Sequence, residues 1–569
     1  MVDNKYLTLN YLIKYGYFDI KNNKTKKNLF YDDNKEYQSS STIYKGIFNC
    51  DELYKNLPCI LKKFDDSFYE ETEPIQFSVY KNDEERRIYK YPNIYSYICL
   101  SKHLEENNNY YDKILKSKQS LSNKFYDRTF LEGKIKRYRN RLGKRYIFKT
   151  DIENFYPSIY THSIPWILAG KSEAKKNKND KKIYYNQLDS LIQRCQYGET
   201  HGIPVGTFAS RIIAEIYMCK IDESLNQYNY VRYVDDFELA YNSKEEQIEF
   251  YNMLYKELKN VNLKIKREKN VTESFPFSVE EDIDCIFTFI IDKIEKLDIN
   301  NKSLISKQRR ILYRLIDFCI LKEKQGKKGS LKLLFKSLKQ AYINNQVDNN
   351  AWKCKIWEGL INIVLMRPQL SNYFLELVDV IDDEELLKYI RNVLDDISGE
   401  IQDNIHRYVD LEYNEEICSI LSICYSLEQW SIVDQDCLLE CIGRLDDFNA
   451  ILAMEMYIKN ENIEWKNLFD ILERKLENSF EWKNEFWLFK YQLFYKIAKE
   501  KGEKFEKEYK DFIYNKYSNG KNKGQFFDKK NIKKIYSPII LDVQNKNGNK
   551  LTQFYKNMYD KNITFFMYK

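Results

Sequence analysis

The pattern of hydrophobic and polar residues divides the chain into two parts. Up to about residue 290, short runs of β-branched and aromatic residues, such as residues 145–150, 231–234 and 237–241, alternate with amphipathic stretches. Runs of this length predict strands, and the stretches between them predict helices. Residues 1–295 are therefore expected to form an α+β domain.

From about residue 300 the strand patterns fade and amphipathic helices follow one another. In residues 383–397 six apolar residues recur at helical spacing, and either Asp382 or Asp383 can cap the helix. Residues 465–476 repeat that spacing with Trp465, Leu468, Phe469, Leu472 and Leu476. Successive helices without strands predict that residues 296–569 form an all-α helical-repeat domain, similar to HEAT arrays.

The composition fits a folded protein with local rather than general affinity for polyanions. Of the 569 residues, 43% are hydrophobic, and 48 Tyr and 33 Phe supply aromatic surface for packing or base stacking. The net charge is only +6, so a nucleic acid would have to be held by local basic patches. Lysine-rich residues 171–182 and 521–534 suit either a solvated loop or phosphate contact.

Cysteine and histidine usage points to a reducing environment. The 12 Cys include no C-x-x-C pair and there are only 4 His, so ligand spacing typical of zinc sites is missing and disulfides are not expected. The amino terminus has no apolar signal segment, and no window reaches the roughly 20 apolar residues that span a bilayer. The expected location is the cytoplasm, without membrane association.

The first candidate functional segment is residues 148–160, in which a predicted strand ends at Asp151. An acidic residue there can ligate a metal ion, and Tyr156 five positions later can lie beneath the sugar of a nucleotide, where its ring would exclude a 2′-hydroxyl. Ile152 is a further candidate ligand through its backbone carbonyl. The alternative is an ordinary turn with a capping aspartate and a core tyrosine.

The second segment is Tyr233-Val-Asp-Asp236, flanked by apolar alternation that predicts a hairpin with two carboxylates at its tip. Adjacent acids repel unless a cation neutralises them, and hard cations such as Mg²⁺ prefer carboxylate oxygens. Two metal ions can promote an in-line displacement at phosphorus, with Asp151 and Asp235 bridging both. Alone the tetrapeptide is weak, because Asp-Asp also occurs in solvated turns such as Asp382-Asp383.

The third segment, residues 201–215, is a Gly/Pro loop that opens a helix. Gly202 and Gly206 allow close approach of a ligand to the backbone, and the helix start offers amide and hydroxyl donors. His201 fits either a structural hydrogen bond or a nucleotide contact. Lys269, in the basic run 263–269, fits either a surface lysine or a group that protonates the leaving pyrophosphate.

The order of these segments resembles the palm signature of reverse transcriptases. The amino-acid sequences of residues 154–156, 160–166, 195–204 and 232–237 are most similar to those of the bacterial abortive-infection branch, AbiK type. The fingers segment 85–93 resembles that family's basic triphosphate-binding element, which makes Arg87 a candidate nucleotide contact. The resemblance covers residues 1–290 in motifs and the remainder only in helical character.

The resemblance implies an antiphage reverse transcriptase that polymerises dNTPs into single-stranded DNA without a template, covalently joined to a tyrosine of the protein itself. It also implies Mg²⁺ (or Mn²⁺) with Asp151, Asp235 and Asp236 as catalytic residues, a closed homo-oligomer and a phage protein as trigger. Residues 34–39 resemble the priming segment, which points to Tyr37, with Tyr31 or Tyr44 next. A phenolic oxygen near a metal ion is a reasonable nucleophile.

One residue departs from the pattern of template-copying enzymes, because Val205 stands where many of them have glutamine. Loss of that amide agrees with relaxed template use. The sequence is also compatible with two other hypotheses. The chain can be a templated reverse transcriptase with an RNA partner, or a catalytically silent scaffold whose helical domain senses phage proteins.

Overall fold

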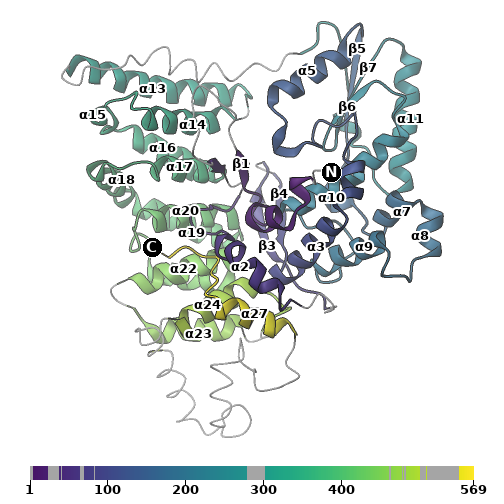
Figure 1. Cartoon of the computed structure of the whole chain (residues 1–569). Coiled ribbons are helices and arrows are strands. Elements are labelled where there is room, and N and C mark those ends of the chain that lie inside the picture. Colours follow the sequence, from purple (N-terminus) through teal and green to yellow (C-terminus); the bar gives the residue numbers. More distant parts are fainter. Residues whose placement is uncertain are drawn as a thin grey trace.

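The computed structural model describes residues 4–23, 37–39, 42–64, 70–82, 84–278, 302–327, 329–460, 463–476, 479, 482–499, 508 and 550–568. These residues form two lobes side by side, a mixed α/β lobe and a stack of helices (Figure 1). The predicted domain boundary at residue 295 and the lysine-rich segment 521–534 lie outside the described residues. None of the helices in the described ranges is both long and apolar enough to cross a membrane.

The α/β lobe contains most of the strands. Its elements are η1 (Lys5–Leu7), α1 (Leu9–Tyr11), η2 (Leu12–Gly16), β1 (Lys21–Asn23), β2 (Tyr37–Ser39), α2 (Asp51–Leu61), β3 (Ile75–Tyr80), β4 (Arg86–Tyr91), α3 (Ile94–Glu106), α4 (Asn108–Ile114), η3 (Phe125–Asp127), α5 (Phe130–Arg141), β5 (Tyr146–Asp151), α6 (Phe155–Ser158), α7 (Ser163–Ala169), α8 (Lys171–Lys176), α9 (Tyr184–Arg194), α10 (Phe208–Ser224), β6 (Tyr230–Tyr233), β7 (Asp236–Tyr241), α11 (Lys244–Asn260), η4 (Arg267–Lys269) and β8 (Val271–Ser274). The strands predicted near residues 145, 231 and 237 are confirmed as β5, β6 and β7.

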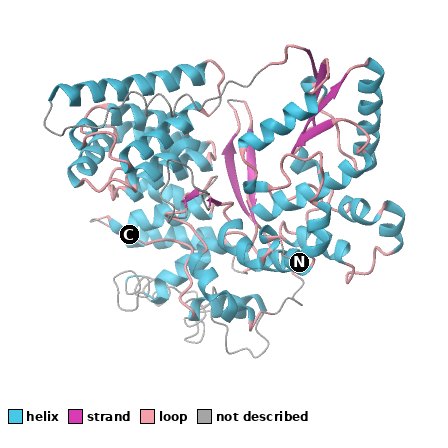
Figure 2. Ribbon diagram, turned by 45° about the horizontal axis from the view of Figure 1, so that its top comes forward, coloured by secondary structure: helices cyan, strands magenta, loops and turns pink. Residues whose placement is uncertain are grey.

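The strands form two separate hairpins, β1–β2 and β3–β4, and one four-stranded sheet of order β6-β7-β5-β8, in which every pairing is antiparallel (Figure 2). Successive side chains of a strand point to opposite faces. One face of the sheet carries Phe148 and Phe237, whose rings pack against Tyr251 and Phe250 of α11. The other face therefore carries the polar and charged residues of β5 and β7, and this is the face on which a site can form.

The second lobe is helical throughout its described part. Its elements are α13 (Lys302–Lys324), α14 (Ser330–Ile343), α15 (Asn349–Trp352), α16 (Ile356–Met366), η5 (Pro368–Leu370), α17 (Ser371–Val378), α18 (Glu384–Asp396), α19 (Ser398–Asp410), α20 (Asn414–Ser426), α21 (Gln435–Arg444), α22 (Asp447–Lys459), α23 (Trp465–Leu476), α24 (Trp487–Lys499) and α27 (Lys550–Asp560). The helices follow one another along the stack in chain order (Figure 1).

The two helices predicted from apolar spacing are both present. Helix α18 begins after Asp383, whose side chain accepts a hydrogen bond from the backbone N–H of Leu386, and α23 spans the predicted residues 465–476. Its apolar stripe is buried at Leu468, Phe469 and Leu472. Amphipathic helices packed in this way confirm a helix-rich second half, while the likeness to HEAT repeats stays a prediction.

The β3–β4 hairpin joins the two lobes. The guanidinium of Arg86 pairs with the carboxylate of Glu416 on α20 at 2.6 Å, and the backbone N–H of Tyr80 donates to Glu415 at 2.7 Å. The backbone N–H of Ser78 donates to Asn414 at 2.8 Å. The helical lobe thus holds the β3–β4 hairpin in place.

Candidate active site

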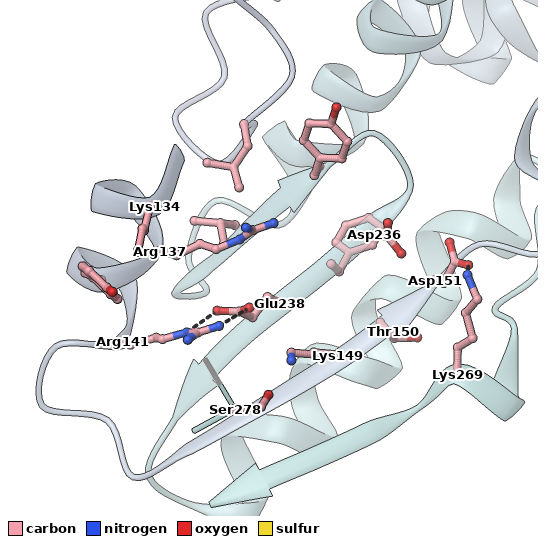
Figure 3. A pocket seen from close by; sticks show the side chains of 15 residues that line it. Lys134, Arg137, Arg141, Lys149, Thr150, Asp151, Asp236, Glu238, Lys269 and Ser278 are labelled. Atoms are coloured by element: carbon pink, nitrogen blue, oxygen red, sulfur yellow. Dashed lines mark hydrogen bonds and ion pairs between the residues drawn. The ribbon is translucent and has the colours of Figure 1, made fainter. Parts of the chain in front are cut away.

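Asp151 and Asp236 lie side by side at one end of the four-stranded sheet. Asp151 is the last residue of β5 and Asp236 the first of β7, and they are direct partners in the antiparallel register. Directly opposite residues point to the same face of the sheet, with Cβ atoms about 5 Å apart. Figure 3 shows both side chains on the open face of the sheet. Two acids that are 85 positions apart in the sequence therefore converge, as the hairpin pattern predicted.

The turn that carries Asp235 is held by a buried arginine. Val234 adopts a positive φ of 56°, which is uncommon for a β-branched residue. Its N–H donates to Ser122 Oγ at 3.0 Å, and its carbonyl accepts a hydrogen bond from Arg232 Nη1 at 2.7 Å. Arg232 has no exposed side-chain surface and pairs with Glu215 at 3.0 Å and Asp222 at 2.7 Å. This network fixes the turn and was not anticipated from the sequence.

The pKa values of two carboxyl groups in the site, those of Asp235 and Asp236, are raised. Burial, followed by the negative charges of Asp151 and Asp236, raises the pKa of Asp235 to about 7. Burial and the charge of Asp151 also raise the pKa of Asp236, while Lys269 and Arg137 oppose the shift. Crowded acids of this kind are stabilised in their ionised form by a cation.

The structure gives two observations that fit a metal cation at Asp151. The ammonium of Lys269 pairs with Asp151 Oδ2, and this contact raises the pKa of Lys269 (Figure 3). The other oxygen, Oδ1, is buried and accepts no hydrogen bond from the described residues. A buried carboxylate oxygen without a donor retains a lone pair for a ligand, so the residues fit a divalent ion bound between Asp151 and Asp235. Ile152 lies next to them, buried and bridged to Ile265.

The Gly/Pro loop lies against the β3–β4 hairpin, as a close backbone approach requires. Gly202 and Gly206 both have positive φ, 76° and 128°, and a Cβ on Gly206 would contact Tyr89 and Tyr91 at 3.4 Å. The backbone N–H of Lys90 donates to the carbonyl of Val205 at 2.7 Å. Helix α10 then begins after the loop, capped by Thr207. The prediction of a loop that opens a helix is confirmed.

Tyr156 lies between this loop and the acidic cluster. Its side chain is half-buried, and burial raises the pKa of its hydroxyl, with the positive charge of Arg211 opposing the shift and the negative charge of Asp235 adding to it. Arg211 pairs with Asp19 at 3.0 Å, and Tyr126 donates to Asp19 at 2.6 Å. Arg211 and Asp19 therefore lie close enough to the predicted sugar-contact residue to influence the pKa of its hydroxyl. Sequence reasoning missed them because Asp19 stands in an unremarkable segment, and only its positive φ of 48° marks it.

The remaining candidate residues are dispersed. Arg87 is exposed on β4, and His201 is exposed beside Tyr160, with ring centroids 5.7 Å apart. The backbone of Tyr37 pairs with Asn23 in the β1–β2 hairpin, while Tyr31 lies outside the described residues. Tyr44 is buried and its hydroxyl donates to Asp379. A buried phenol with a bonded hydroxyl is poorly suited to react, so Tyr44 is the weaker candidate for priming.

Helix α5 forms a basic wall beside the acids. A cavity of about 280 Å³ lies between α5 and the open face of the sheet, and Asp151 and Asp236 line it (Figure 3). Its basic lining residues are Lys134, Arg137, Arg141, Lys149 and Lys269. Arg141 forms a bidentate pair with Glu238 at 2.7 Å, which anchors the helix over β7. Such a surface can hold phosphates next to the carboxylates.

Comparison with known proteins identifies the domain that contains these residues. Residues 95–313 match the family "Reverse transcriptase (RNA-dependent DNA polymerase)". Solved structures similar to this chain include apo telomerase from Candida tropicalis, with 13% identity over 66% of this chain and 73% of that chain and a TM-score of 0.29. Telomerase from Candida albicans in complex with a fragment of telomeric RNA has 12% identity over 63% and 67%, with a TM-score of 0.26. No curated protein sequence matches the chain.

The chain therefore contains a reverse transcriptase domain and is a nucleotidyltransferase of the DNA polymerase type. Domains of this family generally use divalent metal ions and bind nucleotides and nucleic acid. The match includes the strand end at Asp151, the Gly/Pro loop and the Asp235-Asp236 turn.

Proposed function

We propose that this reverse transcriptase domain polymerises dNTPs by a two-metal-ion mechanism at Asp151, Asp235 and Asp236. The direct strand pairing of Asp151 with Asp236 carries the proposal, because it brings acids from two separate segments to one edge. Asp151 and Asp235 would hold Mg²⁺, or Mn²⁺, together with the carbonyl of Ile152. The bound ions would supply Lewis-acid activation of the attacking hydroxyl and charge neutralisation at the leaving pyrophosphate.

The residues of the chain then position the nucleotide. The ring of Tyr156 would pack beneath the sugar and exclude a 2′-hydroxyl. Arg211 and Asp19 form an ion pair near this ring. The positive-φ backbone at Gly206 would let the nucleotide approach the main chain closely, and Arg87 would contact the triphosphate. Lys269 would leave Asp151 for the phosphates and donate a proton to the pyrophosphate. About half of its side chain is exposed to solvent in the ion pair with Asp151.

We propose further that synthesis is untemplated and primed from Tyr37, in an antiphage, abortive-infection system of the AbiK type. The sequences of the motifs and the valine at position 205 support this proposal. In the structure, β1 begins two residues after Asp19, which pairs with Arg211 beside Tyr156. Burial, and to a smaller extent the positive charge of Arg211, lowers the pKa of Lys21, the first residue of β1. The hairpin that carries Tyr37 therefore starts near the candidate nucleotide site. A closed homo-oligomer and a phage protein trigger belong to the same proposal.

The priming proposal is tested by labelling. Purified protein incubated with labelled dNTPs and Mg²⁺ is expected to gain a DNA adduct that protease destroys. Tyr37→Phe should abolish the adduct, and the matched control Tyr44→Phe should keep it, provided both variants show the thermal stability of a folded protein. Adducts on Tyr37→Phe equal to those on the original protein would disprove the assignment of Tyr37 but leave the polymerase intact.

Two further outcomes would replace parts of the proposal. Product length and sequence that depend on added RNA would favour a templated enzyme with an RNA partner. Undiminished protection of bacteria by an Asp235→Asn/Asp236→Asn variant would favour a scaffold that senses phage, because loss of both charges should abolish metal-dependent transfer.

A further inference from the structure

A second cluster of metal-ligating side chains lies in the helical lobe, where α19 packs beside α21. His406 projects from α19, while Asp434 is the N-cap of α21 and Cys437 lies in its first turn. One ligand atom from each of these three residues lies within 4.8 Å of the others. Imidazole, carboxylate and thiol gathered at this separation are a combination of donors that acidic surface patches lack.

A second thiol lies next to the first. Cys441 is one helical turn beyond Cys437, so the two side chains share a face of α21. Both cysteines are fully buried, whereas His406 and Asp434 are partly exposed. The three donors of the group thus run from the surface inward, and Cys441 lies one turn further along α21.

The imidazole of His406 is held between two carboxylates. Its Nε2 lies 3.6 Å from Asp434 Oδ2, and its Nδ1 lies 3.6 Å from Glu440 Oε2. In zinc sites one histidine nitrogen binds the metal and the other donates its proton to a carboxylate that orients the ring. Glu440 occupies the place of that orienting carboxylate. The separation of Nε2 and Asp434 Oδ2 is close to the roughly 3.3 Å that two tetrahedral ligands about 2.0 Å from zinc would have.

We propose that His406, Asp434 and Cys437 bind one zinc ion in a closed structural site that ties α19 to α21, with Cys441 on the same face of α21 turning in as the fourth ligand and Glu440 orienting His406. Thiolate and imidazole ligands select Zn²⁺ over the Mg²⁺ that the polymerase carboxylates would take. On binding, both thiols lose their protons to solvent and two sulfur–zinc bonds form, with no change of oxidation state. The site is independent of the polymerase proposal, because it uses none of the same residues.

The site has no recognisable sequence motif, because its ligands are on two different helices. Cysteines at positions i and i+4 of a helix face one way without the C-x-x-C spacing of zinc knuckles, and the histidine is 31 positions before Cys437. Only the packing of α19 on α21 brings them together.

Zinc content and cobalt spectroscopy on the full-length protein test the proposal. Protein incubated with ZnCl₂ and desalted is expected to retain one equivalent of zinc per chain, and removal of the zinc should lower its thermal midpoint. Cobalt substitution should give the near-ultraviolet charge-transfer band of thiolate ligation. Asp235→Asn/Asp236→Asn should leave both signals unchanged, because the polymerase site contains no thiol.

Variants locate the ligands. His406→Ala and Cys437→Ser should each lose the retained zinc, and Glu440→Gln should weaken binding about 10- to 100-fold. His162→Ala is the matched control, because His162 is a partly exposed histidine paired with Asp189 at 2.6 Å outside the cluster. Absence of retained zinc in the original protein, a cobalt spectrum without the thiolate band, or equal zinc in folded Cys437→Ser would each overturn the proposal.

Discussion

Asp151 and Asp236 are direct partners across the β5–β7 ladder, with Lys269 as the cation beside Asp151. Since Asp235 is the next residue along the turn, three carboxylates crowd one edge of the sheet, and burial together with their mutual repulsion raises the pKa of Asp235 to about 7. The arrangement is unfavourable for an isolated protein and favourable for one that binds divalent cations. This conflict between stability and function is typical of active sites.

The first prediction concerns these acids. Asp151→Asn or Asp235→Asn should lower nucleotide incorporation by roughly 10³-fold or more, because loss of even one preorganised electrostatic contact in an active site costs about 10²- to 10³-fold. Without metal ions, Asp235→Asn should raise the thermal midpoint, since it removes a repelled charge. Primer extension or self-labelling and thermal unfolding in EDTA measure the two effects. Asp403→Asn, at an exposed position, is the control and should change neither.

The second prediction concerns Arg232, which is fully buried between Glu215 and Asp222. Arg232→Met leaves both carboxylates buried without their partner, and breaking a buried pair in this way lowers the free energy of unfolding by about 3–5 kcal/mol. Denaturant unfolding measures the loss.

A surface pair gives the matched comparison. Lys5 pairs with Asp127 at 2.6 Å and more than half of each side chain is exposed, so Lys5→Met should lower the free energy of unfolding by about 1 kcal/mol or less. Similar losses for the two variants would show that the buried network does not hold the turn, as argued above from the contacts of Val234.

These residues also show which features of the fold can be predicted from the sequence. Strands β5, β6 and β7 and the position of Asp235 could be predicted from the local alternation of apolar and polar residues. Every second residue of a strand lies on the same face, and a hairpin tip lies between two such runs. Helix α18 and its cap followed from apolar spacing and Asp383 in the same way. The candidate acids could therefore be named before their contact was seen.

Interactions between distant elements could not be read in this way. Arg232 looks like any charged strand residue until α10 brings Glu215 against it, and Asp19 gains its role only when α10 places Arg211 beside it. The zinc-type cluster of α19 and α21 is hidden for the same reason. In each case the chemistry depends on tertiary packing rather than on spacing in the chain.

The third prediction concerns sugar selection. If the ring of Tyr156 excludes a 2′-hydroxyl, Tyr156→Ala should reduce the preference for dNTPs over rNTPs by about 10-fold or more, since shape alone can reject an added hydroxyl by about 10². Tyr156→Phe keeps the ring and should keep the preference. Incorporation of each nucleotide class, compared as kcat/KM, decides the matter. Equal loss of preference in both variants would assign selection to the phenol hydroxyl rather than to the bulk of the ring.

The last prediction concerns pH and the contact between the lobes. Burial raises the pKa of Glu415 to about 7, although its carboxylate accepts a hydrogen bond from Tyr80 and lies near the positive charges of Arg86 and Lys332. Between its unfolded pKa and 7 the folded protein therefore binds more protons at this site than the unfolded chain. Its contribution to stability must fall as pH rises through this window.

Glu415→Gln keeps an acceptor for Tyr80 and removes the charge, so its thermal midpoint should exceed that of the original protein at pH 8 and approach it at pH 5. The neighbouring Glu416→Gln should have the opposite sign at pH 8, because it removes the partner of Arg86. Thermal unfolding of the three proteins between pH 5 and 8 tests both signs. A Glu415→Gln midpoint below that of the original protein at pH 8 would mean that the ionised carboxylate stabilises the joint between the β3–β4 hairpin and α20.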